Sequence, residues 1–296
     1  VSYGDQRLYN EAKKWCMKAY VKRDQMPIKM QILTNWAHAN YFETPNEAIR
    51  YLKQLLEIDD QQAWVYYLLG HAYNNLYQYD NAIPEFEKSL EIFNKWGSKG
   101  SWFYSYASLG QAYHKCGLYG KEKELYAKAG LDSTDNYLLI ARQAILSLTQ
   151  GDTTAANRYI KQFIDVRKSN SIPEDSIMST LAEIYTAAGK PDTAEKIYRQ
   201  ALLLEPESAY RMNGLAFFLI DEGRNINEGM DLINKALLLN PDNSLFLDTK
   251  GWGLHKQGKN TESLKVLEKS WELKSVYNHR KFLHLEEVKK AIASQK

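Results

Sequence analysis

The chain has 296 residues, of which 44% are hydrophobic, and this proportion is sufficient for a folded core and argues against disorder. Lys plus Arg number 38 and Asp plus Glu number 36, so the formal net charge is only +2, without the basic excess that nucleic acid or an anionic membrane would attract. The longest apolar run, 214–220, is far shorter than the roughly 20 residues that a membrane helix needs. We therefore expect no nucleic-acid partner and no membrane insertion.

Residues 1–28 are predicted to form an N-terminal helix or a partial repeat. The stretch LYNEAKKWCMKAYVKRD places Ala12 and Ala19 where the second helix of a repeat would have small residues. Two interpretations stay open: this helix caps the array, or an upstream domain has been removed. The chain begins at Val1 without Met and without a signal peptide, which favours a processed or excised piece.

From residue 29 onward, three series of small residues recur about 34–40 residues apart, with aromatic residues between them. The first series consists of Gly70, Gly110, Ala144, Ala182, Ala216 and Gly251. The second follows shortly after it, at Gly117, Gly151, Gly189, Gly223 and Gly258. The third consists of Ala48, Ala82, Ala156, Ala194, Gly229 and Ser263, with one step of two periods between Ala82 and Ala156.

Each period is predicted to form two helices. In the unit that contains WVYYLLGHAYNNL, Gly70 would let the second helix approach closely, and Phe86 would fill the space beside it. The glycine between the helices suits a left-handed C-cap, where a Cβ would cost free energy. Since one such unit cannot bury its apolar face alone, neighbouring units must stack into a solenoid.

This pattern resembles the tetratricopeptide repeat, whose period is about 34 residues. The resemblance implies an all-α solenoid of about seven helix-turn-helix units in a right-handed superhelix, with a concave groove. The expected units are 29–62, 63–96, 103–136, 137–170, 175–208, 210–243 and 244–277, with insertions between some of them. A C-terminal helix, 278–296, would cap the array; a membrane-surface helix is the alternative, but its apolar face is thin.

The family lines its groove with side chains of the first helix of each repeat. Carried onto this chain, the groove and peptide-binding positions hold Trp64, Tyr67, His71, Tyr104, Gln111, Tyr210, Asn213, Phe217, Asp248 and Trp252. Exposed aromatic residues are preferred anchors in interfaces, and Trp64, Tyr67 and Tyr104 form the best cluster. The alternative for each residue is burial by neighbouring helices. A carboxylate clamp is not expected, because Leu33 and Ala37 stand where the family would have Lys and Asn.

No pattern of a catalytic centre is present. The chain lacks a Gly-rich phosphate loop and a His-Glu-x-x-His motif, and Asp59–Asp60 reads as a solvated helix end. His71 and His114 could approach each other, but without carboxylate or Cys support for a metal. Cys16 and Cys116 are interpreted as small buried apolar residues, compatible with a reducing compartment and slightly favouring the cytoplasm over the periplasm. We expect no enzyme activity, cofactor or metal.

The leading functional hypothesis is a non-catalytic scaffold that binds a protein or peptide partner in the concave groove. The alternative is a regulatory or sensory segment of a larger bacterial signalling enzyme, acting in cis. It rests on the stretches KAYVKRDQMP and NEAIRYLKQLLEID, which resemble repeat arrays that follow TolB-like, cyclase or kinase domains. A third possibility, an enzyme in its own right, has no motif to support it.

Overall fold

A computed structural model describes residues 9–95, 105–129 and 137–294, and every regular element in these ranges is helical. The expected all-α fold of paired helices is confirmed. The helices group into two compact units, which are described separately. The predicted insertion NKWGSKGSW and the predicted groove residue Tyr104 lie largely or wholly outside the described residues.

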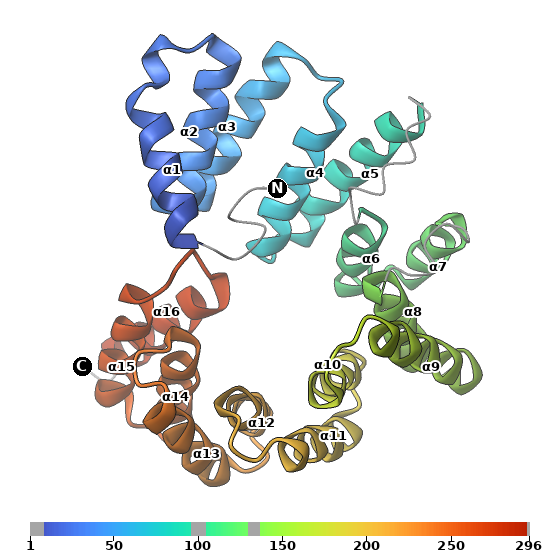
Figure 1. Cartoon of the computed structure of the whole chain (residues 1–296), viewed down its shortest axis with the longest axis vertical. Helices are drawn as coiled ribbons and strands as arrows, with labels where there is room; N and C mark the ends of the chain where they lie inside the picture. Colours follow the sequence, from blue (N-terminus) through green and yellow to red (C-terminus); the bar gives the residue numbers. More distant parts are fainter. Residues whose placement is uncertain (1–8, 96–104, 130–136, 295–296) are drawn as a thin grey trace. The chain divides into compact units, whose positions relative to one another are not determined.

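Unit 1 comprises residues 1–128 together with the short segment Ser275–His279. Its helices are α1 (Tyr9–Val21), the 3-10 turn η1 (Arg23–Gln25), α2 (Ile28–Phe42), α3 (Pro45–Ile58), α4 (Ala63–Asn75), α5 (Tyr79–Lys95), α6 (Ser105–Lys115) and α7 (Tyr119–Lys128) (Figure 1).

Unit 2 comprises residues 129–274 and 280–296. Its helices are α8 (Tyr137–Gln150), α9 (Thr153–Ser169), α10 (Glu174–Ala187), α11 (Pro191–Leu204), α12 (Ala209–Asp221), α13 (Ile226–Leu239), α14 (Ser244–Lys256), α15 (Asn260–Glu272) and α16 (His279–Ala293), whose first residue belongs to unit 1.

The turn inside most helix pairs depends on a left-handed residue. All five glycines of the second series have positive φ, between 63° and 77°, as a left-handed C-cap requires. In the pair α4–α5 this position is occupied by Tyr77, with φ 58°. A non-glycine residue pays about 1–2 kcal/mol for this conformation, so the α4–α5 turn is strained where the others are relaxed.

Within each pair, the first small-residue series permits close helix contact. A Cβ added to Gly70 on α4 would lie 2.6 Å from the Phe86 ring on α5, closer than van der Waals contact allows. Phe86 itself is fully buried. The same relation recurs between Gly251 on α14 and Leu267 on α15, so the small residue and the large partner act together.

Neighbouring pairs stack where the second helix of one pair contacts the first helix of the next, as α5 contacts α6, α11 contacts α12 and α13 contacts α14. First helices of neighbouring pairs also contact each other, as α8 contacts α10 and α12 contacts α14. In unit 1 the core runs along α2, α3 and α4 and includes Leu52, Leu55, Val65 and Leu69. In unit 2 separate clusters form around Phe163 and Phe246. None of the described helices is both long and apolar enough to span a membrane.

Candidate binding groove

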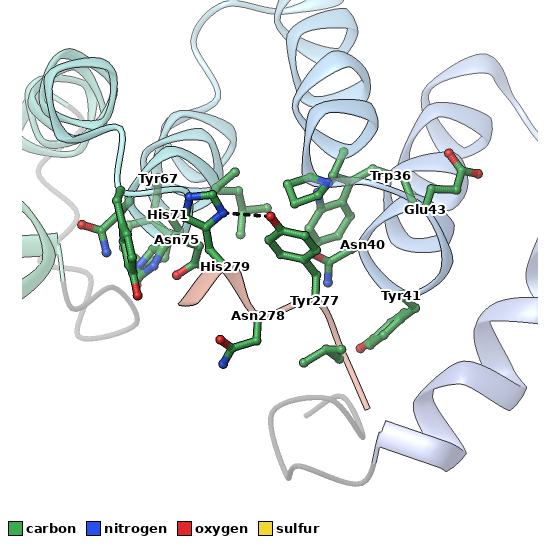
Figure 2. A pocket seen from close by; sticks show the side chains of 18 of the residues that line it. Trp36, Asn40, Tyr41, Glu43, Tyr67, His71, Asn75, Tyr277, Asn278 and His279 are labelled. Atoms are coloured by element: carbon green, nitrogen blue, oxygen red, sulfur yellow. Dashed lines mark hydrogen bonds between the residues drawn. The ribbon is translucent and has the colours of Figure 1, made fainter. Parts of the chain in front are cut away.

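Unit 1 contains a cavity of about 740 Å³ between helix α2, helix α4 and the segment 276–279 (Figure 2). Its size is within the range typical of ligand sites. The lining includes Trp36, Asn40 and Tyr41 from α2, Tyr67, His71, Asn74 and Asn75 from α4, Tyr77 from the following turn, and Gln111 from α6.

The described lining of this cavity carries aromatic and amide groups and no Lys or Arg. Its one carboxylate, Glu43, lies 2.7 Å from His38 Nδ1. Asn74 Oδ1 is buried and accepts no hydrogen bond within the described part of the chain. A wall of this kind can pack against an uncharged peptide and accept a hydrogen bond from its backbone, but it offers no cation for a terminal carboxylate.

His71 lines the cavity and is neutral at physiological pH. Its Nε2 is 3.1 Å from Ser108 Oγ, and its ring makes edge-on contact with Tyr67, with the ring centroids 4.5 Å apart. Burial lowers the His71 pKa from 6.5 to about 4, because the charged imidazolium would lose its hydration. The site therefore presents an uncharged imidazole.

This shift predicts how unit 1 responds to acid. Between pH 6.5 and about 4 the unfolded chain binds a proton at His71 that the folded chain does not, so the free energy of unfolding should fall with decreasing pH. The loss should approach about 3 kcal/mol at pH 4, at roughly 1.4 kcal/mol per pKa unit. Urea unfolding of wild type and His71→Gln at several pH values checks this. An equally steep pH dependence in His71→Gln would contradict the assignment to His71.

Of the predicted groove residues in unit 1, Tyr67, His71 and Gln111 line the cavity. Trp64 is partly buried and packs against the α2–α4 core instead. Of the two described members of the predicted cluster of Trp64, Tyr67 and Tyr104, only Tyr67 therefore lines the cavity.

Several cavity residues were missed by sequence reasoning. Tyr77 carried a signal, because it interrupts the glycine series between the two helices of a unit. Trp36 and Asn40 carried none beyond their place on a first helix. Tyr277 and His279 come from a stretch where the repeat phase is lost.

In unit 2 the predicted residues are spread over separate environments. Tyr210 is 60% exposed, with its ring edge-on to Phe246. Asn213 accepts a 2.8 Å hydrogen bond from Thr249. The guanidinium of Arg280 lies over the Phe217 ring, 4.2 Å from its centroid.

Two predicted groove residues of unit 2 have almost no exposed surface. Asp248 is 0% and Trp252 5% exposed, because helix α16 packs on helix α14. His284 of α16 places its Nδ1 3.1 Å from Asp248 Oδ1 and stacks its ring on Trp252, with centroids 4.2 Å apart. The expectation of surface anchors at these two positions is corrected: in this structure they hold the C-terminal helix.

The described residues contain no group of three or more His, Cys, Asp and Glu side chains arranged to hold a metal ion. The two histidines considered as a metal pair have other partners: His71 contacts Ser108, and His114 Nδ1 lies 2.9 Å from Glu122 Oε2. Cys16 is buried and Cys116 is half-buried, 3.5 Å from Asp80 Oδ1.

The fold defines the class: consecutive helix pairs, with glycine turns and first helices in contact, are a helical-repeat array. Sequence profiles of the tetratricopeptide repeat match residues 65–95 and 178–210. The chain therefore contains tetratricopeptide repeats.

Relatives share this class but differ in length. A repeat-containing protein of Pseudomonas aeruginosa is 34% identical over 93 residues, covering 31% of this chain and 15% of the relative. A second repeat-containing protein, from Methanocaldococcus jannaschii, is 23% identical over 224 residues, covering 73% of this chain and 38% of the relative. The chain thus spans well under half the length of either relative. The crystal structure of PilW, a type IV pilus biogenesis factor, aligns with a TM-score of 0.53 at 16% identity, covering 73% of this chain and 93% of PilW, a likeness of fold alone.

Proposed function

We propose that this protein is a non-catalytic interaction scaffold and that the unit 1 cavity binds an extended peptide of a protein partner. The observation that carries the proposal is the lining: aromatic rings from α2 and α4 beside side-chain amides, with no Lys or Arg among the described lining residues. Aromatic side chains bury much area at little entropic cost, and amides can pair with a peptide backbone.

The chemistry of the cavity favours one kind of peptide. We expect an internal or uncharged segment, because the Glu43 carboxylate of the wall already lies next to His38 and the His71 imidazole is neutral. A peptide that depends on its terminal carboxylate would find no cationic partner there. The ligand we expect presents aromatic side chains to Trp36 and Tyr67.

The proposal predicts a specific pattern of affinities. Peptides selected from a random display library on the full chain should lose about thirtyfold or more in affinity on Tyr67→Ala, the effect of truncating an anchor. Tyr210→Ala is the matched control, because Tyr210 is an exposed aromatic residue at a predicted groove position in unit 2. It should leave the affinity within about threefold of wild type.

Melting temperatures of both variants must accompany the affinities, since Tyr67 also contacts the Phe86 ring at 6.0 Å between centroids. The opposite pattern, with loss on Tyr210→Ala and none on a folded Tyr67→Ala, would place the peptide site in unit 2 and contradict the proposal.

The second candidate function, a regulatory array acting in cis within a larger protein, is favoured by one observation. The segment 276–279 of this same chain lines the unit 1 cavity, which supports binding of a segment that is covalently attached to the groove.

A further inference from the structure

A short stretch between α15 and α16 packs into unit 1 rather than with its neighbours in sequence. Residues Ser275–His279 belong to unit 1, whereas the residues on either side, Lys274 and Arg280, belong to unit 2. The stretch has no helix before His279, and four of its residues, 276–279, form one wall of the cavity.

Two side chains of this stretch, Tyr277 and His279, contact unit 1. Tyr277 packs against the apolar core of unit 1 beside Trp36, and burial raises the Tyr277 pKa. Its hydroxyl lies 2.8 Å from His279 Nδ1. The His279 ring makes edge-on contact with Tyr77, with centroids 5.1 Å apart, and burial lowers the His279 pKa.

The side chains alternate in direction. Figure 2 shows Tyr277 and His279 directed toward the helices of unit 1, while Asn278 between them points the other way. Alternation is how an extended peptide offers every second side chain to a groove.

We infer that Val276–His279 is an intramolecular ligand of the unit 1 groove, with which the peptide of a partner competes. The inference rests on the proposed function of the same cavity. It also specifies the partner's peptide: an extended, uncharged stretch with a tyrosine and, two residues later, an imidazole or another aromatic ring.

The backbone conformation of Tyr77 is a second observation that supports this assignment. Tyr77 is 46% exposed and holds a left-handed conformation that glycine occupies at the equivalent position of five other turns. Backbone strain of this kind is often retained at functional positions. Here the Tyr77 ring contacts the ring of His279.

The competition can be measured with a labelled peptide that copies residues 272–281, ELKSVYNHRK, titrated with the full chain by fluorescence anisotropy. Wild type should bind it weakly, because the tethered copy occupies the groove at a high effective concentration. Tyr277→Ala should bind it at least tenfold more tightly. Ser275→Ala is the matched control, because Ser275 is exposed and does not line the cavity, and it should bind like wild type. A peptide with Ala in place of its tyrosine should bind neither variant.

Hydrogen exchange of residues 275–279 tests the contact without any added ligand. Exchange should be slowed in wild type and become at least tenfold faster in Tyr77→Gly, even though this substitution relieves strain and should raise the melting temperature. Ser171→Gly is the control, because Ser171 is the other non-glycine residue described with positive φ and lies in unit 2. It should also raise the melting temperature and leave exchange of 275–279 unchanged.

Unprotected amides at 275–279 in wild type, or equal or weaker binding of the peptide to a folded Tyr277→Ala, would overturn the inference. If library peptides nevertheless depended on Tyr67, the proposed function would survive. If they did not, the cavity itself would not be a peptide site.

Discussion

Replacing Asp248 by Asn is expected to lower the free energy of unfolding of unit 2 by about 3–5 kcal/mol, the usual result of removing one partner from a buried ion pair. The carboxylate has no exposed surface, and it faces His284 at 3.1 Å and Arg280 at 3.7 Å. Lys281 is also buried and donates a hydrogen bond to Ser244.

Asp248 matters because it compensates several cationic groups of α16 at once. Burial lowers the Lys281 pKa to about 8, and the charge of Asp248 acts against this decrease. Without the carboxylate, the buried Lys281 ammonium and the partly exposed Arg280 guanidinium would lie near an amide that cannot balance their charge. Helix α16 should then detach from α14 before the rest of unit 2 unfolds.

Asp242→Asn is the matched control in the same unit. Asp242 pairs with Lys269 at 2.8 Å, but both side chains are more than half exposed, and such surface pairs contribute about 0–1 kcal/mol. Urea unfolding of both variants at neutral pH checks the difference. Similar values for the two would mean that the Asp248 cluster does not hold α16.

Phe86→Ala is expected to lower the free energy of unfolding of unit 1 by about 3–5 kcal/mol, the cost of a cavity in a packed core. Gly70→Ala should lower it by about 1–3 kcal/mol, because the added methyl group would lie 2.6 Å from the Phe86 ring. The two costs share one cause, so in the Phe86→Ala background the Gly70→Ala change should become nearly neutral. A double-mutant cycle should yield a coupling of at least about 1 kcal/mol.

Gly120→Ala controls for helix propensity, since Gly120 is also in a helix but a Cβ there would meet no atom within 4 Å. It should stabilise by up to about 1 kcal/mol. Additive effects of Gly70→Ala and Phe86→Ala would contradict the account of small residues as contact points between paired helices.

The helix pairs could be predicted from sequence because their determinants are local and repeated. Small residues such as Gly70 and turn glycines such as Gly117 act on neighbours within the same unit, and both did what their spacing predicted. Tyr67, His71 and Gln111, which were predicted as groove residues from their register on first helices, line the unit 1 cavity.

The burial of Asp248 and the contacts of segment 275–279 could not be predicted, because they depend on residues outside the repeat pattern. Asp248 occupies a groove register, but its burial results from a match with His284 on a helix outside the repeat. The contact between Tyr77 and His279 joins residues some 200 positions apart. Loss of the repeat phase near His279 indicates an irregular stretch, but it does not indicate which helices that stretch contacts. The sequence shows Tyr77 at a position where the other units have glycine, and a residue that breaks a local pattern often marks a functional or strained site.

The claim that the unit 1 cavity is the peptide site is tested most directly by hydrogen-exchange mass spectrometry of the full chain with a saturating library-selected peptide. If the peptide binds there, exchange should slow in α2 and α4, around residues 36–41 and 67–75, and should become faster at 275–279 as the tethered segment is displaced. Slower exchange confined to α10, α12 and α14, with no change at 36–41 or 67–75, would contradict it.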